Sequence, residues 1–412
     1  MNVHPEIRDN LEARMAPVSE LKTRHDFKAA AERARALRST IESAAPQIER
    51  QRELSPELLE KLHAAKMFRL LLPRSLGGEE LEPATYLQVI EELGKADGSI
   101  AWCVAQASGC SMSAAYLPPE VAQEIFGAED AVLAWGPSGP NAKAIKGEGG
   151  YRVTGTWMFA SGSRHSQWLG GHSPVVDAQG AAVMGADGKP LERTVLFAKS
   201  KAEIADVWHV VGLKGTGSDT YSVSDLFVPE TYSFTRESAE DRREKGPLYR
   251  FTTFQLYGVG FAGVALGLGR ACLDAFVELA GIKAPKAYAK LLRENTVIQA
   301  QVALSEAKLQ SSRAFLLQVL QDMWDSATQG KEFSIAQRAA LRLAGTYAVH
   351  QAKDVVDTVY HAGGATAIFE SNPFERRFRD VHTVIQQIQA QAANFELVGQ
   401  LLLGMPSNSK LI

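Results

Sequence analysis

The chain has 412 residues, of which 45% are apolar and 22% are charged, as in an ordinary globular protein with a large core. Lys and Arg number 44 and Asp and Glu 47, a net charge of −3, and no block of like charge stands out. This balance argues against nucleic acid or an anionic membrane as the main partner. The polar N-terminus lacks the apolar stretch of a secretory signal, and the three cysteines lack metal-binding spacing. We therefore expect a cytoplasmic protein with reduced thiols and no metal site.

The first 130 residues are predicted to be mainly helical, with an extension over 1–24 and a helical domain over 25–130. The triplet Ser-Pro-Glu that begins at Ser55 is a typical helix start, because serine caps free N–H groups, proline fits the first turn and glutamate faces the helix dipole. The apolar pattern that follows predicts one helix as far as Pro73. Two further helices are expected over Tyr86–Gly94 and Ser99–Ala115.

Residues 131–235 are richer in Gly, Pro, Thr and Val, and they are predicted to form a β domain. Short runs of alternating residues indicate strands separated by turns, which is typical of a small barrel or sandwich. These runs are AVLAW, GGYRVTGTWMFASG, RTVLFAK and YSVSDLFVP. A charged connector over 236–249 follows the last strand.

Residues 250–412 are predicted to be helical again and to form a four-helix bundle. A capping box begins at Ser334, and apolar residues at helical spacing follow it until Gly363 and Gly364 end the helix. The longest apolar run, Phe254–Gly269, is short for a membrane span, so we expect a packed core helix.

That apolar run contains Gly258-Val-Gly260-Phe-Ala-Gly263, which matches the GxGxxG pattern of dinucleotide sites. Such a site requires a strand before the glycines and a βαβ unit around them, and this segment is predicted to be helical throughout. We therefore interpret the glycines as positions of close helix packing.

Two polar segments of the β domain could contact a ligand. The segment GLKGTGSDT offers hydroxyl groups at Thr216 and Ser218 on a flexible backbone, although it would also fit an ordinary polar turn. In a regular strand Trp157, Phe159 and Ser161 share one face, which would present a flat apolar wall and a hydroxyl to a planar heteroaromatic ring. The same pattern also fits a barrel core with one hydrogen-bonded serine.

Four motifs in this order make the chain resemble the acyl-CoA dehydrogenase superfamily over about residues 30–404. They are PRSLGG, the GTWMFASG strand, GLKGTGSDTYSVSDLFVP and GGATAIFESNPFERRFRD. The GTGS turn and the WxFxSG strand resemble the branch of flavin-dependent monooxygenases, the oxygenase components of two-component systems. The resemblance implies an α+β fold with an N-terminal helical domain, a middle β-barrel domain and a C-terminal four-helix bundle. It also implies a homotetramer that binds flavin (FAD or FMN) between the last two domains.

The resemblance also implies residues that contact the cofactor. By position, Phe159 stands where an aromatic side chain packs near the flavin ring, and Ser161 where a hydroxyl donates to N5 or O4. The implied cofactor-binding residues are Trp135, Ser138, Trp157, Phe159, Ser161, Thr216 and Ser218 around the ring, and Arg293, Gly363 and Gly364 at the phosphate arm, often across a subunit boundary.

The helix after the Arg-Asp pair that ends at Asp380 departs from both branches of this family. The position of the dehydrogenase's catalytic Glu falls on Ile388, and that of the monooxygenase's His falls on Gln387. An amide can hold a substrate by hydrogen bonds but cannot transfer a proton at neutral pH. We expect Gln387 to project into the cavity beside the flavin, with His165 as the substitute acid–base group and Ser161 as the third catalytic residue.

These observations favour a monooxygenase that hydroxylates a small, aromatic substrate with O₂ and reduced flavin from a separate reductase. The chain has no NAD(P)H site of its own in this interpretation, which fits a two-component system. Two alternatives stay open at this point: an acyl-CoA dehydrogenase-like enzyme with an unusual base, and a flavin-binding homologue without catalysis.

Overall fold

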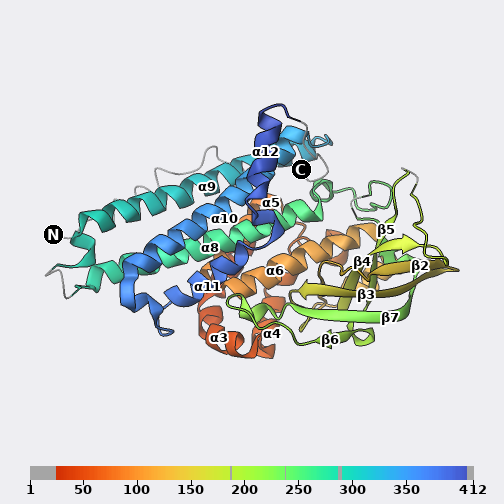
Figure 1. Cartoon of the computed structure of the whole chain (residues 1–412), viewed down its shortest axis with the longest axis horizontal. Coiled ribbons are helices and arrows are strands. Elements are labelled where there is room, and N and C mark those ends of the chain that lie inside the picture. Colours follow the sequence, from red (N-terminus) through yellow and green to blue (C-terminus); the bar gives the residue numbers. More distant parts are fainter. Residues whose placement is uncertain (1–24, 186–187, 237, 286–289, 406–412) are drawn as a thin grey trace.

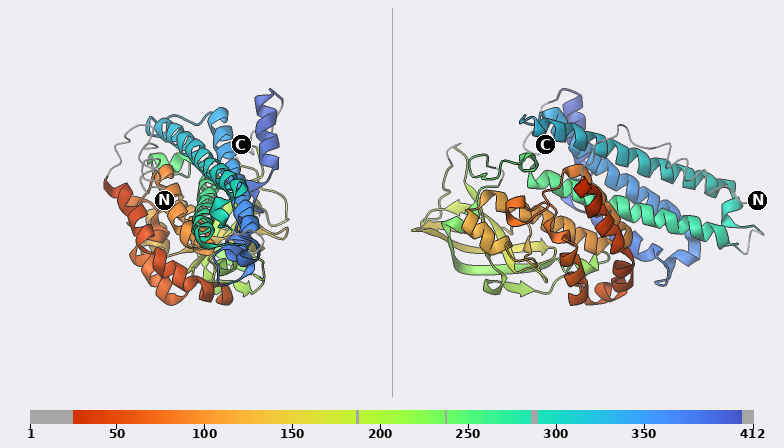
Figure 2. Two further views of the ribbon diagram at one scale, coloured as in Figure 1. Left: turned by 90° about the vertical axis from the view of Figure 1, so that its left-hand side faces the viewer. Right: turned by 180° about the vertical axis from the view of Figure 1, so that it is seen from behind.

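The computed structural model describes residues 25–185, 188–236, 238–285 and 290–405. It confirms the expected order of a helical part, a β domain and a second helical part (Figure 1). The β domain lies at one end of a long helical bundle, and the N-terminal helices pack against both, as the view from behind also shows (Figure 2).

The N-terminal domain confirms the expected helices but corrects one boundary. Its helices are α2 His25–Ala36, α3 Arg38–Gln51, α4 Pro56–Ala64, α5 Pro83–Ala96, α6 Gly98–Ser111 and α7 Pro119–Phe126. Helix α4 is capped as predicted, because Ser55 Oγ accepts a hydrogen bond from the Leu58 N–H at 3.4 Å. It ends at Ala64 and not at Pro73, because Lys66 has left-handed backbone angles (φ 60°) that turn the chain.

The β domain is a single series of paired strands. They are β1 Leu133–Trp135, β2 Lys143–Gly147, β3 Gly150–Ala160, β4 Trp168–Val176, β5 Glu192–Ala198, β6 Glu203–Ala205, β7 Asp219–Pro229 and β8 Ser233–Phe234. The strands are hydrogen-bonded in the order β6-β7-β3-β2-β4-β5-β8, and β1 pairs with β4. Among the described strands β6 does not pair with β8, so the sheet surrounds a core without closing into a complete barrel. The four predicted strands are confirmed as β1, β3, β5 and β7.

Strand β4 was not predicted, because its central Gly170 and Gly171 resemble a turn. The structure shows that these glycines leave room for two indole rings. A Cβ at Gly170 would lie 2.7 Å from the Trp135 ring, and a Cβ at Gly171 would lie 2.5 Å from the Trp157 ring. The glycines are therefore required by packing across the sheet, which no local pattern reveals.

The C-terminal part is the expected bundle. Its helices are α8 Thr253–Ile282, α9 Thr296–Thr328, α10 Ile335–Gly363, α11 Phe374–Val384 and α12 Ala393–Leu402. The capping box at Ser334 is present, and α10 ends at Gly364 as predicted. Among the described residues α8 alone is long and apolar enough to cross a membrane, but 89% of its most apolar window is buried inside the protein.

The glycines of α8 serve helix packing, as predicted. A Cβ at Gly260 would overlap the Tyr86 hydroxyl, and a Cβ at Gly267 would overlap the Glu91 carbonyl of α5. Gly258 differs, since a Cβ there would meet only the Gln389 side chain at 3.8 Å.

Replacing Gly267 by Ala should lower the thermal unfolding midpoint, because overpacking typically costs about 1–3 kcal/mol. The matched control in the same helix is Gly281→Ala, since a Cβ at Gly281 meets nothing within 4 Å. The control should be neutral or stabilising by up to about 1 kcal/mol, because alanine favours helix over glycine. Equal midpoints for the two variants in differential scanning calorimetry would contradict the packing assignment.

Candidate active site

Strand β3 contains a bulge that rearranges its predicted ligand-facing side chains. Its pairing with β7 shifts register between Trp157 and Ala160, and Phe159 has a left-handed φ of 57°. As a result Trp157 is 0% exposed whereas Phe159 is 59% exposed, and β3 ends before Ser161. The expectation that Trp157, Phe159 and Ser161 share one face is therefore wrong.

Trp157 belongs to the core of the β domain. Its ring stacks on Tyr221 with centroids 5.5 Å apart, and its Nε1 donates to the His172 carbonyl at 3.1 Å. With no exposed ring surface, Trp157 cannot contact a cofactor directly. The barrel-core interpretation applies to Trp157, and a ligand-facing role stays a prediction for Phe159.

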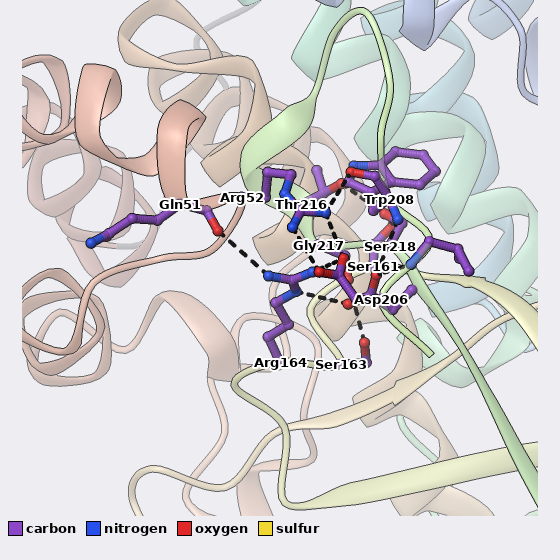
Figure 3. Close-up of polar contacts among 12 residues, drawn as sticks. Gln51, Arg52, Ser161, Ser163, Arg164, Asp206, Trp208, Thr216, Gly217 and Ser218 are labelled. Atoms are coloured by element: carbon purple, nitrogen blue, oxygen red, sulfur yellow. Dashed lines mark hydrogen bonds and ion pairs between the residues drawn. The ribbon is translucent and has the colours of Figure 1, made fainter. Parts of the chain in front are cut away.

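The hydroxyl groups of Ser161, Ser218 and Thr216 form a chain with a fixed direction (Figure 3). Thr216 Oγ1 donates to the Leu213 carbonyl at 2.8 Å, and this bond uses its only hydrogen. Ser218 must then donate to Thr216, and Ser161 must donate to Ser218, each at 2.7 Å. At the other end the Trp102 indole N–H donates to Ser161 Oγ at 2.9 Å.

This direction changes the role expected of Ser161. Its hydrogen is committed to Ser218, so its oxygen can only accept a further hydrogen bond. The structure thus opposes the expectation that Ser161 donates to a cofactor, and it leaves one lone pair free to accept.

An ionic cluster fixes the loop that precedes this chain (Figure 3). Asp219, at the start of β7, accepts from Arg164 Nε at 2.7 Å and from the Trp208 N–H at 3.2 Å. Asp206 bridges Arg164 and Arg52, and the hydrogen bond from Arg52 lowers the pKa of Asp206 to about 2. The loop that carries Trp208 is therefore tied to the N-terminal domain and to β7.

A second anchor ties this loop to the C-terminal bundle. The Leu213 N–H donates to Asp380 Oδ1 at 2.6 Å, and the Gly215 N–H donates to Ser99 Oγ at 3.2 Å. Asp380 is buried beside Asp97, which caps α6. Burial, and then the charge of Asp97, raise the pKa of Asp380 to about 7.

Three stacked aromatic rings lie between α6 and α8, and the sequence analysis missed them. Trp102 stacks on Phe261 with centroids 3.8 Å apart and planes 5° apart, and Phe261 stacks on Tyr257 at 5.6 Å. Gln106 Nε2 donates to the Tyr257 hydroxyl at 3.2 Å and to the Trp135 carbonyl at 3.3 Å. The available signal was the pair of aromatic residues four positions apart in a glycine-rich helix.

The other residues that were expected to contact the flavin ring have different surroundings. Phe159, at the bulge of β3, meets the edge of Trp208 in the loop before β7, with ring centroids 6.2 Å apart. Trp135 is 3% exposed and packs edge-on to His172 at 5.1 Å, so it offers its carbonyl and not its ring. Ser138 is exposed and pairs with β3 through an isolated bridge.

His165 is unsuited to the acid–base role expected of it. Burial, and the nearby His63 and Lys199, lower the pKa of His165 to about 3, so the ring is neutral at physiological pH. Its Nε2 is buried without a partner among the described residues, and its ring lies 5.4 Å from Phe68 of the N-terminal domain. This low pKa disfavours proton delivery by His165, whose catalytic role stays a prediction.

Gln387 begins the turn after α11, and its side chain folds back on this turn. Its Oε1 accepts from the Gln389 N–H at 2.6 Å, and its Nε2 is buried without a partner among the described residues. Ile388 and Gln391 line a cavity of about 600 Å³, and Gln389 lines a smaller one, but Gln387 belongs to neither lining. Its catalytic role stays a prediction.

Arg293, Gly363 and Gly364 lie at the end of the bundle opposite the β domain (Figure 1). Lys283 connects them, because its ammonium binds the Gly363 carbonyl at 2.6 Å while its backbone pairs with Leu292. Helix α8 separates this end from the β domain by its 30 residues, about 45 Å at 1.5 Å per residue. One protomer therefore does not bring these residues together with Ser161.

Comparison with known proteins identifies matches along most of the chain. The family model "Acyl-CoA dehydrogenase, N-terminal domain" matches residues 8–124, and "Acyl-CoA dehydrogenase, C-terminal domain" matches residues 259–392. Indole-3-acetate monooxygenase of Pseudomonas putida is 30% identical over 397 residues, which are 96% of this chain and 98% of that protein.

Two further proteins extend the comparison. The flavin-dependent monooxygenase oxygenase subunit HsaA of Mycobacterium tuberculosis is 25% identical over 374 residues, 88% of this chain and 92% of that one. The crystal structure of XiaF from Streptomyces sp. in complex with FADH₂ and glycerol superposes with a TM-score of 0.84 at 24% identity. It covers 98% of this chain and 99% of XiaF, which shows a shared fold.

Asp380→Asn should raise stability at neutral and alkaline pH. The folded-state pKa of about 7 exceeds the usual 3.8. The contribution of Asp380 to folding stability is therefore fully present below pH 3.8 and is lost as the pH rises through 7. Asparagine keeps an oxygen for the Leu213 N–H and has no charge to repel Asp97. Urea unfolding should show a gain of roughly 1–3 kcal/mol at pH 8 and little at pH 4.

The matched control for this prediction is Asp225→Asn, because the Asp225 side chain is 73% exposed. It should leave the pH dependence of unfolding unchanged. An Asp380→Asn variant with the same pH profile as the wild type would show that Asp380 stays ionised.

Proposed function

The chain belongs to the acyl-CoA dehydrogenase superfamily, in its branch of flavin-dependent monooxygenase oxygenase components, and on this premise we propose that it hydroxylates a small aromatic compound. The reaction would use O₂ and reduced flavin, FAD or FMN, supplied by a separate reductase. The observation that carries this proposal is the similarity to indole-3-acetate monooxygenase along nearly the full length of both chains.

The residues around Ser161 fit a flavin. Phe159 offers an exposed apolar ring beside Trp208, and Ser161 offers a free acceptor. A bound reduced flavin supplies the two electrons that reduce one atom of O₂ to water. Reduced flavin carries a hydrogen on N5 and oxidised flavin does not, so an oxygen that only accepts favours the reduced form. This suits an oxygenase that receives its flavin already reduced.

The alternative of an acyl-CoA dehydrogenase-like enzyme lacks a catalytic base near Ser161 and the stacked rings. Helix α6 and residues 253–273 of α8 contain no Asp or Glu, and the family's base position is Ile388, which is 55% exposed. Asp380 is occupied by the Leu213 N–H. A flavin-binding homologue without catalysis would consume no O₂ to make a hydroxylated product, and the following experiment measures that product.

The test combines purified protein, a flavin reductase, NADH and isotopically labelled O₂ with a panel of aromatic compounds that includes indole-3-acetate. Mass spectrometry should find one labelled oxygen atom in a product that requires the protein. Reduced flavin consumed only to hydrogen peroxide across the whole panel would contradict hydroxylation. Desaturation of an acyl-CoA without O₂ would support the dehydrogenase instead.

Ser161→Ala should weaken the binding of reduced flavin by about 3- to 10-fold, since one net hydrogen bond contributes about 1 kcal/mol. Its effect on oxidised flavin should be smaller. The matched variant Ser218→Ala frees the hydrogen of Ser161, so it should improve oxidised-flavin binding and narrow the preference for the reduced form. Anaerobic fluorescence titrations measure both constants, and equal losses for both flavin forms in Ser161→Ala would contradict the acceptor role.

We further place the protein in the cytoplasm as a homotetramer. The end of the bundle that carries Arg293 exposes Val297, Ile368 and Phe369 by 62%, 61% and 59%, as expected of a surface covered by another copy. Arg293 and Gly364 would then reach the phosphate arm of a flavin held by another protomer. The free, buried cysteines support a reducing compartment, which cell fractionation tests.

Phe369→Glu should dissociate the assembly, because it places a charge in the centre of the proposed contact. Sedimentation velocity at micromolar concentration should give a tetramer for the wild type and smaller species for the variant. The exposed control Ile204→Glu, on β6, should remain tetrameric. A monomeric wild type would refute the assembly.

A further inference from the structure

Two adjoining cavities lie between the start of α8, helix α10 and the segment after α11. The larger has a volume of about 600 Å³ and reaches the β domain, and the smaller has about 30 Å³, roughly the share of one water molecule. Both are lined by Phe254 of α8 and Arg342 of α10. Neither Arg342 nor the two cavities belonged to the site that the sequence predicted.

Arg342 is a partly buried cation without an anionic partner. Its guanidinium lies 5.0 Å from the Phe254 ring and donates to the Asn394 side-chain oxygen at 2.9 Å. Burial lowers the pKa of Arg342, and no described carboxylate lies within 4 Å to oppose this. Arg164, beside the hydroxyl chain, is by contrast bound to two carboxylates.

Arg338 adds a second cation to the smaller cavity. It precedes Arg342 by four residues, so both side chains lie on one face of α10. The Nε of Arg338 is buried without a hydrogen-bond partner among the described residues. A buried N–H without a partner is costly, and an oxyanion beside both guanidinium groups would satisfy it.

The mouth of the larger cavity is more balanced in charge. Arg236 there is paired with Glu192 at 3.6 Å, and Glu192 and Glu396 are both exposed to solvent. Exposed carboxylates are screened by water, whereas Arg342 and Arg338 lie further inside. The net attraction for an anion is therefore at the inner end.

Two glycines leave part of the wall between these arginines and the stacked rings without side chains. Gly258 and Gly345 both line the smaller cavity, and a Cβ at either would meet nothing closer than 3.7 Å. Along the same face of α8, Phe254 and Phe261 are separated by seven residues, about 10 Å. The Trp102–Phe261 stack is joined to Ser161, so this face of α8 leads from Phe254 to the proposed flavin site.

We propose that Arg342, with Arg338 beside it, binds the carboxylate of the substrate, whose aromatic ring lies in the adjoining 600 Å³ cavity beside Phe254. This inference rests on the proposed function and narrows its substrate class to aromatic acids with a short side chain. Bidentate contact between a guanidinium and a carboxylate fixes both distance and orientation. Arg342 thus selects the acid and sets which ring atom reaches the flavin.

Binding to flavin-free protein tests the proposal without relying on turnover. Isothermal titration compares three acids with their uncharged amides: indole-3-acetate, phenylacetate and benzoate. At least one acid should bind the wild type at least 30-fold more tightly than its amide, about the loss seen when one partner of a buried ion pair is removed. No preference for the acid in any pair would overturn the proposal.

Arg342→Met keeps the length of the side chain without its charge and should abolish this preference, while Arg342→Lys should restore part of it. The matched control Arg236→Met removes a cation that is already paired at the mouth, so it should change acid binding by less than about threefold. Circular dichroism verifies folding. Retention of the preference in Arg342→Met would also overturn the assignment.

A flavin phosphate is the other oxyanion that could occupy this site, and a further arm separates the two sources. Reduced FMN and reduced riboflavin differ only by the phosphate, so Arg342→Met should affect both equally if the substrate occupies the site. A selective loss of FMN binding would assign Arg342 to the cofactor and overturn the proposal. Labelled hydroxylation of an uncharged aromatic compound alone would also overturn it, while leaving the proposed function intact.

Discussion

The backbone of Leu213 is the point on which the arrangement of the site depends. Its N–H is held by Asp380 of α11 at 2.6 Å, and its carbonyl accepts from Thr216 at 2.8 Å and from the Trp208 indole at 3.0 Å. Leu213 has a left-handed φ of 51°, a conformation that costs free energy in a residue other than glycine. The three hydrogen bonds offset this cost, and they join the bundle, the loop and the hydroxyl chain at one place.

The arginines of this chain divide into two groups with different physical roles. Arg52 and Arg164 are saturated by carboxylates, and they hold the loop between β6 and β7 in place. Arg338 and Arg342 are partly buried and have no such partners among the described residues. A partly buried, unpaired cation costs free energy unless a ligand supplies the opposite charge. The paired arginines therefore stabilise the structure, whereas the unpaired arginines are available to bind a ligand.

The sequence was sufficient for features that depend on local patterns. The caps at Ser55 and Ser334, the alternating strands β3 and β7, and the packing glycines of α8 all followed from spacing and residue type. It failed where a distant contact decides the outcome. The two glycines of β4 are explained only by the rings of Trp135 and Trp157, which come from other strands.

The candidate site was less predictable for the same reason. The bulge that turns Phe159 outward results from the register of β3 against β7, about 60 residues later in the chain, and period-two reasoning cannot detect it. The low pKa of His165 arises from burial against Phe68 and from His63, both in the N-terminal domain. Trp102 and Phe261 meet only because α6 and α8 pack together.

The groups around the flavin site hold protons in place and do not move them. A hydrogen-bonded chain can relay a proton only if its last member can take one up, and the chain from Trp102 ends at the Leu213 carbonyl, which cannot. His165 is neutral, and Gln387 carries an amide. Neither the hydroxyl chain nor these two side chains supplies a proton at neutral pH, so the proposed reaction would take its protons from water. We therefore expect the site to direct the proposed reaction by positioning its ligands and not by transferring protons.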